Sequence, residues 1–237
     1  MTIDLSLQFP LYVQDEFPLV ASCVQLLDSD ILDIGCGNGE TSRRAAVDGG
    51  ARRVVGIEVD EIQHRKNVER TWPANLEFRL CGAEALDFPD ASFDAVLMFK
   101  SLHHVPHELM AQAFEQMHRV LRPGGRVYIS EPVYDGPFND IGRLYHDEGV
   151  VRQKAIEAIA AAVGKGLFVL DRQVNFLSPI EFKDFEAYRK RMLGVTHTQH
   201  RVSDELMAKI ETAFRAHLAP NGANFIRPMR VDLLVRA

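Results

Sequence analysis

Apolar runs and segments of helical spacing alternate along the first 130 residues of the chain. Five short runs rich in β-branched and apolar residues predict buried strands, and segments with apolar residues three and four positions apart predict helices. This alternation predicts the α/β class, with a doubly wound, mostly parallel sheet and helices on both faces. The expected strands are Ile31–Ile34, Arg53–Ile57, Leu76–Leu80, Phe93–Phe99 and Arg126–Ser130, and the expected helices are Asp15–Leu27, Glu40–Val47, Glu61–Arg70 and Glu108–Leu121.

The pattern changes after Glu131. A loop with two prolines and a glycine over 132–137 precedes a helical pattern over 138–163, which two glycines end. Further along, we expect a helix from Pro179 to about Leu193, a helix that Ser203 caps and that runs to about Leu218, and a strand over Arg230–Val235.

These features predict a single domain with a helical insertion after the fifth strand. Ligands of open α/β sheets bind beyond the carboxyl ends of the strands, so we expect the insertion to cover that edge. Within 1–237, the expected parts are an N-terminal helical lid (1–29), a core (30–130), a helical cap (131–177), and C-terminal helices with the last strands (178–237).

Composition and charge narrow the class of partner and the compartment. The formal net charge is −6, which disfavours nucleic acid because its binders usually show a basic surplus. Three cysteines, Cys23, Cys36 and Cys81, fit neither a disulfide framework nor a metal knuckle and indicate a reducing compartment. The first residues have no basic patch followed by an apolar run, and no apolar segment is long enough to span a bilayer. We therefore expect a cytoplasmic protein.

A glycine-rich turn joins the first expected strand to the next helix, in the order Asp33-Ile34-Gly35-Cys36-Gly37-Asn38-Gly39. Glycines let the backbone turn tightly and let a ligand approach, and amides at the helix start favour an anionic group. Alone, such a turn is as often a plain connection as a ligand site. Glu58 ends the second strand and adds a carboxylate that can accept two hydrogen bonds from a ribose diol, although it could also be a solvated carboxylate.

The spacing of the glycines separates two cofactors. The dinucleotide fingerprint is GxGxxG, whereas this turn is GxGxG, and Glu40 stands three positions after Gly37. A pyrophosphate at this helix start would meet the Glu40 carboxylate, which is unfavourable. A ligand that carries an amino-acid group has no such conflict, and a nicotinamide-dependent oxidoreductase is disfavoured.

Six collinear segments resemble the motifs of class I S-adenosylmethionine (SAM)-dependent methyltransferases. They are Ile31-Leu32-Asp33-Ile34-Gly35-Cys36-Gly37-Asn38-Gly39, Gly56-Ile57-Glu58, Cys81-Gly82-Ala83-Glu84-Ala85-Leu86, Ser92-Phe93-Asp94-Ala95-Val96, Leu102-His103-His104-Val105 and Leu121-Arg122-Pro123-Gly124-Gly125-Arg126. The subgroup that the chain resembles is the ubiquinone/menaquinone-biosynthesis and related small-molecule methyltransferases. The resemblance spans 31–130 and implies their Rossmann-like fold, S-adenosyl-L-methionine as cofactor and S-adenosylhomocysteine as product.

The resemblance also implies which residues hold SAM. The implied set is Gly35, Cys36 and Gly37 along the methionine part, Asp33 at the loop and the amino group, Glu58 at the ribose, Ala83 and Glu84 beside the adenine, and Phe99 and Lys100 at the methyl-transfer site.

Two positions need separate interpretation: Gly82, which precedes Ala83 of this set, and Cys36, which belongs to it. Family members often carry an acid before the Ala-Glu pair, where it can accept from the adenine amino group, and here that position is Gly82. Adenine recognition then falls to Glu84 or to backbone carbonyls. A thiol at Cys36 could indicate redox or arsenic chemistry, but the other cysteines are distant in sequence, so a small apolar filler is the better interpretation.

Candidate catalytic groups lie near the ends of the fourth and fifth strands and in the cap. Holding acceptor and methyl donor in line supplies up to about 7–11 kcal/mol of the barrier, and a base typically adds about 10²–10⁴-fold where the nucleophile carries a proton. The candidates are His104, Glu131 and His146, with His103 as a further base; His104 could instead shape the site, and Glu131 could be a structural acid. His103 and His107 have a metal-ligand spacing, but no third ligand is apparent and we expect no metal.

The cap is dense in polar and aromatic residues that could line an acceptor pocket, although about half of them could face solvent instead. The predicted acceptor-binding residues are Tyr134, Arg143 and Tyr145 in the cap and Tyr12 in the lid, and Tyr12 could equally have a packing role. The acceptor is expected to be a small molecule. Two alternatives stay open: a SAM enzyme of this fold with chemistry other than methyl transfer, and a non-catalytic SAM-binding protein. Monomer and homodimer are both compatible with the sequence.

Overall fold

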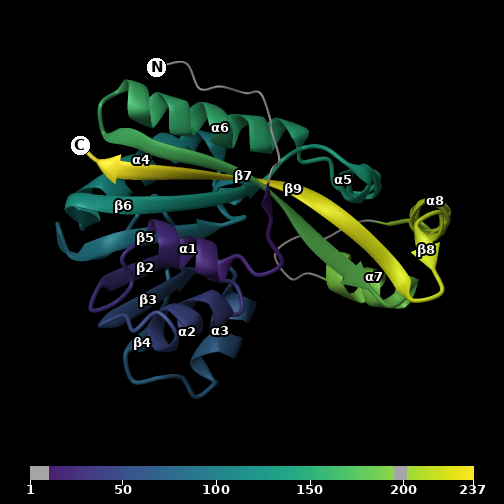
Figure 1. Ribbon diagram of the computed structural model, residues 1–237, viewed down its shortest axis with the longest axis horizontal. Coiled ribbons are helices and arrows are strands. Elements are labelled where there is room, and N and C mark those ends of the chain that lie inside the picture. Colours follow the sequence, from purple (N-terminus) through teal and green to yellow (C-terminus); the bar gives the residue numbers. More distant parts are fainter. Residues whose placement is uncertain (1–10, 195–201) are drawn as a thin grey trace.

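Nine strands among the described residues form one sheet in the computed structural model, which describes residues 11–194 and 202–237 (Figure 1). The sheet order is β1-β7-β9-β6-β5-β2-β3-β4, and β8 pairs with β9. The strands are β1 (Leu11–Tyr12), β2 (Asp30–Ile34), β3 (Arg53–Glu58), β4 (Leu76–Leu80), β5 (Phe93–Phe99), β6 (Leu121–Pro132), β7 (Phe168–Phe182), β8 (Leu218–Ala219) and β9 (Gly222–Arg236).

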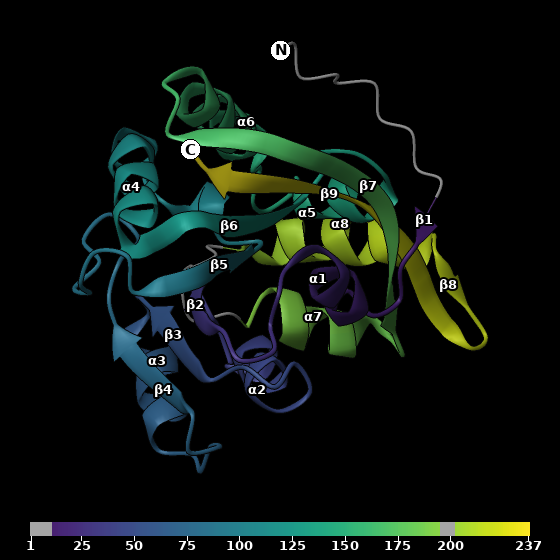
Figure 2. The ribbon, with the colours of Figure 1, turned by 60° about the vertical axis from the view of Figure 1, so that its left-hand side comes forward.

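Helices alternate with the first strands and cover both faces of the sheet (Figures 1 and 2). They are α1 (Phe17–Cys23), α2 (Glu40–Val47), α3 (Glu61–Val68), the 3₁₀ turn η1 (Leu102–His104), α4 (His107–Val120), α5 (Pro137–Gly142), α6 (Gly149–Gly164), α7 (Phe185–Met192) and α8 (Asp204–Arg215). Strands β2 to β6 pair in parallel, and β9 is antiparallel to β6, β7 and β8. The predicted fold class is therefore confirmed.

Alternate residues of the central strands enter two separate cores. In β5, Val96 and Met98 pack toward the face covered by α4 and α6, whereas Ala95 and Leu97 pack toward the face covered by α1 and α2. Because β5 is buried on both faces, its sequence is almost wholly apolar. In the sheet, β3 and β4 lie on one side of β2, and β5 and β6 lie on the other, so the carboxyl ends of β2, β3 and β5 meet where ligands of such sheets bind.

The C-terminal part departs from the prediction. Residues 168–182 form the long strand β7, not a loop followed by a helix from Pro179, and the helix in this region is the shorter α7. Among the described residues, strand β1 pairs with β7 at Phe176 and Leu177 and not at Pro179, a position where an edge strand tolerates a proline. The last strand, β9, is likewise much longer than Arg230–Val235.

The predicted lid and cap also differ in detail. Helix α1 is shorter than Asp15–Leu27, the strand β1 precedes it, and residues 1–10 lie outside the described residues. The expected helix over 138–163 is divided into α5 and α6, with six residues between them. Helix α8 begins, as predicted, after Ser203, whose hydroxyl accepts from the Leu206 amide at 3.2 Å.

A third core, rich in aromatic rings, holds the far ends of β7 and β9 together with α5, α7 and α8 (Figure 2). Its buried rings include Phe182, Tyr188, Phe214 and Phe225. This core fixes in place the ends of β7 and β9 that lie next to the predicted cap. Within the described ranges, every helix is too short or too polar to traverse a bilayer.

Candidate functional site

The glycine loop between β2 and α2 has one open position. Gly35, Gly37 and Gly39 all have positive φ, at 69°, 54° and 77°. A Cβ on Gly35 would lie 2.5 Å from the Ser101 Cβ, and a Cβ on Gly39 would lie 2.5 Å from the Phe78 ring, so the loop is packed at these two positions. A Cβ on Gly37 would meet nothing within 4 Å. Open space at Gly37 therefore lets a ligand lie against the backbone.

Glu58, at the end of β3, holds this loop in place. One carboxylate oxygen accepts from the Gly37 amide at 2.9 Å, and the other accepts from the amides of Val59 and Asp60 at 2.8 and 3.1 Å. A carboxylate offers about four acceptor positions, so capacity is left for a ligand hydroxyl. The residue predicted to bind a ribose thus lies directly beside the open glycine.

Asp33 is a buried carboxyl below the same loop, only 1 % exposed. The Ser42 hydroxyl donates to it at 2.6 Å. Burial raises the pKa of Asp33 to about 6, because the hydrogen bond from Ser42 opposes desolvation only in part and the negative charge of Glu58 adds to it. A cation placed at the loop would relieve this unfavourable charge.

Cys36 is buried within the loop, and burial raises the pKa of its thiol. A high pKa keeps the thiol protonated and unreactive. The Asn67 side chain donates to the Gly37 carbonyl at 2.7 Å from below, which fixes the loop next to Cys36. This environment supports a packing role for Cys36.

In the loop after β4, the Glu84 carboxylate lies close to position 82, where this sequence has a glycine in place of an acid. A Cβ on Gly82 would fall 2.3 Å from a Glu84 carboxylate oxygen, so the Glu84 side chain folds back over Gly82. Ala83 is buried and packs into the core with Leu86. The Glu84 carboxylate therefore occupies the space that the side chain of an acid at position 82 would need.

Phe99 and Lys100 lie where β5 leaves the sheet. Lys100 has a φ of 54°, and its ammonium lies 3.9 Å from a Glu16 carboxylate oxygen. Burial lowers the pKa of Lys100, and Glu16 partly offsets that effect. Residues before and at the start of α1 contribute here too, which the sequence did not reveal. A cavity of about 150 Å³ is lined by Asp15, Glu16, Phe17, Thr41, Arg44, Phe99 and Lys100.

Glu131, predicted as a catalytic acid, has both carboxylate oxygens engaged inside the protein. One accepts from the Leu102 amide at 2.9 Å, and the other forms a short contact with His103 Nδ1. Both His103 and Glu131 are buried. This geometry favours Glu131 as the group that fixes the orientation of His103.

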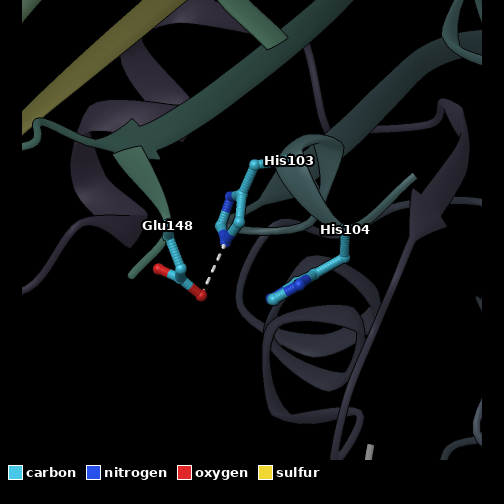
Figure 3. A group of neighbouring side chains, drawn as sticks. All are labelled: His103, His104 and Glu148. Atoms are coloured by element: carbon cyan, nitrogen blue, oxygen red, sulfur yellow. Dashed lines mark ion pairs between the residues drawn. The ribbon is translucent and has the colours of Figure 1, made fainter. Parts of the chain in front are cut away.

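On its other side, His103 faces Glu148, which precedes α6 (Figure 3). The distance from His103 Nε2 to a Glu148 oxygen is 3.7 Å, and Glu148 also pairs with Arg152 at 2.5 Å and with His146 at 3.3 Å. Burial alone would lower the pKa of His103, but the carboxylates of Glu131 and Glu148 raise it to about 9. Burial likewise opposes ionisation of Glu148, yet His103 and Arg152 hold its pKa well below the usual value.

His104 lies beside His103 on η1, and the two rings are 4.1 Å apart (Figure 3). Among the described residues, one donor atom each of His103, His104 and Glu148 lies within 4.8 Å of the others, so this is a set that could hold a metal ion. Sequence spacing pointed instead to His103 with His107, which is exposed and pairs with Glu108 at 3.0 Å. Because Arg152 and His103 balance the charge of Glu148 and Glu131, the group does not require an ion.

A cavity of about 310 Å³ lies between the sheet edge and the cap, beside this cluster. Its lining includes the predicted residues Lys100, His104, Tyr145 and His146. It also includes residues that the sequence analysis did not single out: Pro132, Val133, Phe138, Glu148 and Arg152 in the predicted cap, and Met192, Arg227 and Pro228 from elements farther along the chain.

Three predicted acceptor-binding residues are not among the lining residues of this cavity. Tyr134 donates to Asp147 at 2.6 Å, and Arg143 stacks over the Tyr134 ring at 5.4 Å. Tyr12 is 59 % exposed on β1. All three residues are exposed at the surface, which for Tyr134 and Arg143 is the alternative that the sequence analysis left open for the cap residues.

The core of the chain matches a known protein family. Residues 31–125 match the family model described as "Methyltransferase domain". The chain is 40 % identical over 105 residues to the 27-O-demethylrifamycin SV methyltransferase of Amycolatopsis mediterranei, an alignment that covers 43 % of this chain and 38 % of that protein. It is 33 % identical over 124 residues to the ubiquinone/menaquinone biosynthesis C-methyltransferase UbiE of Hahella chejuensis, covering 50 % of this chain and 48 % of that protein.

The chain thus spans less than half the length of these two relatives. The similarity in structure extends further. The YcgJ protein of Bacillus subtilis superposes with a TM-score of 0.63 at 18 % identity, over 92 % of this chain and 96 % of that chain. At this identity the likeness concerns the fold, which includes the cap and the C-terminal strands.

Proposed function

Residues 31–125 belong to the class I SAM-dependent methyltransferases, and from this membership we propose that the protein transfers a methyl group from SAM to a small-molecule acceptor. The observation that carries the proposal is the open backbone at Gly37, flanked by the carboxylates of Asp33 and Glu58. The acceptor atom is oxygen, nitrogen, sulfur or carbon. A cytoplasmic location and the exclusion of nucleic acid as acceptor are parts of the same proposal.

The residues present fit SAM. A Cβ at position 37 would fill the space that the loop leaves open, and the buried charge of Asp33 suits an ammonium group. Asp33, Gly35, Cys36 and Gly37 would hold the methionine part, Glu58 the ribose, Ala83 and Glu84 the adenine, and Phe99 and Lys100 the end nearest the acceptor. When bound, SAM supplies a methyl group on a sulfonium, which is a good leaving group.

The chain's own contribution is to place the acceptor and exclude water. Lys100 lines both the cavity at the start of α1 and the larger cavity under the cap, so the two are neighbours. His104 and His146 line the larger cavity and are the proposed bases for an acceptor that must lose a proton. Glu131 contacts the Leu102 amide and His103 Nδ1 of η1, so it orients the His103 ring and is a positioning residue in this scheme.

Replacing Glu58 by alanine is expected to weaken SAM binding by tenfold or more, about 1.4 kcal/mol, because the carboxylate both holds the loop and binds the ligand. Calorimetric titration with SAM and S-adenosylhomocysteine measures the effect, with NAD as the ligand control. Glu61→Ala, an exposed acid at the start of α3, is the matched variant and should bind normally. Binding of NAD without SAM would overturn the proposal.

The position of Glu84 gives a second prediction. Glu84→Ala is expected to weaken SAM and S-adenosylhomocysteine binding about tenfold, and Gly82→Asp in that variant should restore most of it, because an acid at 82 then has the space that Glu84 leaves. In the wild-type background, Gly82→Asp should weaken binding, since the two carboxylates would compete for one place. Equal affinity of all four proteins would assign adenine recognition to backbone groups.

Product analysis separates the remaining alternatives. Incubation with SAM and a panel of phenolic, amine, thiol and enol acceptors should give S-adenosylhomocysteine together with a product heavier by one methyl group. A SAM enzyme with different chemistry would give another product. A non-catalytic protein would bind SAM without consuming it.

A further inference from the structure

Arg227, in β9, is a cation without an acidic partner at the wall of the larger cavity. It is half-buried, and its Nε is buried without a hydrogen-bond partner. Its guanidinium donates to the Ser178 hydroxyl at 3.4 Å, and within the described ranges no carboxylate lies within 4.0 Å of it. Burying a charge without a counter-charge costs free energy, so the unpaired Arg227 guanidinium lowers the stability of the folded protein.

Other cations surround Arg227, and acids do little to neutralise it. Lys100 lines the same cavity, and its ion pair within the described residues is a long one, to Glu16 at 3.9 Å. Burial and the charges of Arg191 and Arg152 lower the pKa of Arg227, while Glu16 acts in the opposite direction. Arg152 differs, because it pairs closely with Glu148. The cavity therefore has one side with excess positive charge.

The cavity wall also has apolar residues, beside the polar Asp135 and Asn139. Phe138, Met192, Pro132 and Pro228 contribute to it, and the Arg227 guanidinium stands 5.8 Å from the Phe138 ring centre. A cavity of about 310 Å³ is of the size that binds small ligands with a largely apolar body. The same cavity is also lined by His103, His104 and His146.

We propose that Arg227, with Lys100, forms a subsite for an oxyanion, so that the methyl acceptor is a small apolar molecule that carries a carboxylate or a phosphate group. This inference rests on the proposed function. A guanidinium binds either group through two parallel charge-assisted hydrogen bonds. The anion would be held at Arg227, which would direct the other end of the acceptor toward His104 and the methyl donor.

A purely structural Arg227 would behave differently. Its contact with the Phe138 ring would contribute to stability and would give no preference between charged and neutral ligands. The test therefore compares ligands of one shape and different charge. Benzoate and phenyl phosphate are the anionic probes, and benzamide is the neutral probe. Binding to the protein of residues 1–237 is measured by calorimetry or ligand-observed NMR, with and without S-adenosylhomocysteine.

We expect the wild-type protein to bind at least one anion tenfold or more tightly than benzamide, and the preference to fall as KCl rises from 50 to 500 mM. Arg227→Gln should abolish the preference and Arg227→Lys should retain part of it. Arg215→Gln removes an exposed arginine of α8 outside the cavity lining and should leave it unchanged. The stronger of the two anions shows whether the acceptor group is a carboxylate or a phosphate.

Equal binding of benzoate, phenyl phosphate and benzamide to the wild-type protein would overturn the subsite, and so would a preference that survives in folded Arg227→Gln. If that variant does not fold, the salt dependence of the wild type and the Lys variant decide. Failure of the proposed function has another signature: the protein would bind neither SAM nor S-adenosylhomocysteine, whatever the probes do. Binding of S-adenosylhomocysteine without an anion preference removes only the subsite.

Discussion

Replacing His103 by leucine is expected to destabilise the folded protein by about 3–5 kcal/mol at pH 7, the typical effect of removing one partner from a buried charged pair. His103 is 4 % exposed and Glu131 is 8 % exposed. Without the imidazole, Glu131 keeps only the Leu102 amide as a donor, and its charge stays buried. Urea unfolding followed by circular dichroism measures the change. His107→Leu, which removes an exposed histidine from the start of α4, should stay within about 0.5 kcal/mol of wild type.

The same pair should make stability depend on pH. The pKa of His103 rises from 6.5 to about 9 in the folded protein, so its stabilising contribution is fully present below pH 6.5 and is lost as the pH rises through 9. A shift of this size corresponds to roughly 3 kcal/mol. The unfolding free energy of the wild type should therefore fall between pH 6.5 and 9, and that of His103→Leu should fall less. Parallel curves would mean that His103 is neutral in the folded protein.

The parts of the site that could be predicted are local in sequence. The glycine loop, Asp33 and Glu58 belong to one strand–turn–helix unit and the next strand, and the spacing of the glycines together with the family resemblance singled them out. The central strands could be predicted for a similar reason. A strand such as β5, buried on both faces, leaves a continuous apolar run in the sequence.

The acceptor side could not be predicted in this way. Strand β7 is an edge strand with mixed exposure and a proline, so its sequence lacks the clear period of a buried strand. The strand order β7-β9-β6 brings Arg227 next to the cap. The residues around Arg227 in the sequence form no pattern that would predict this proximity to the cap. Tyr134 and Arg143 stay a prediction as acceptor-binding residues; they contact each other at the surface, where aromatic and charged residues are as common as in a pocket.

Asp33→Asn is expected to stabilise the ligand-free protein at pH 7 and to weaken its binding of SAM. The folded protein raises the pKa of Asp33 from 3.8 to about 6, so the buried carboxylate is a cost that appears as the pH rises from 4 to 6 and stays constant above that. Two pKa units correspond to roughly 3 kcal/mol. The asparagine removes the charge, and its carbonyl oxygen can still accept from the Ser42 hydroxyl.

The gain in stability should coincide with a loss of cofactor affinity. A hydrogen bond between charged groups contributes about 1.5–3 kcal/mol, so the variant should bind SAM roughly tenfold to a hundredfold more weakly. Thermal unfolding at pH 4, 6 and 8 and calorimetry with SAM measure the two effects on the same samples. Asp140→Asn, an exposed acid of α5, should change neither. A variant that is less stable at pH 8 and binds SAM normally would assign Asp33 to the scaffold alone. The expected opposite changes would mean that the fold tolerates a buried charge because the ligand's ammonium neutralises it.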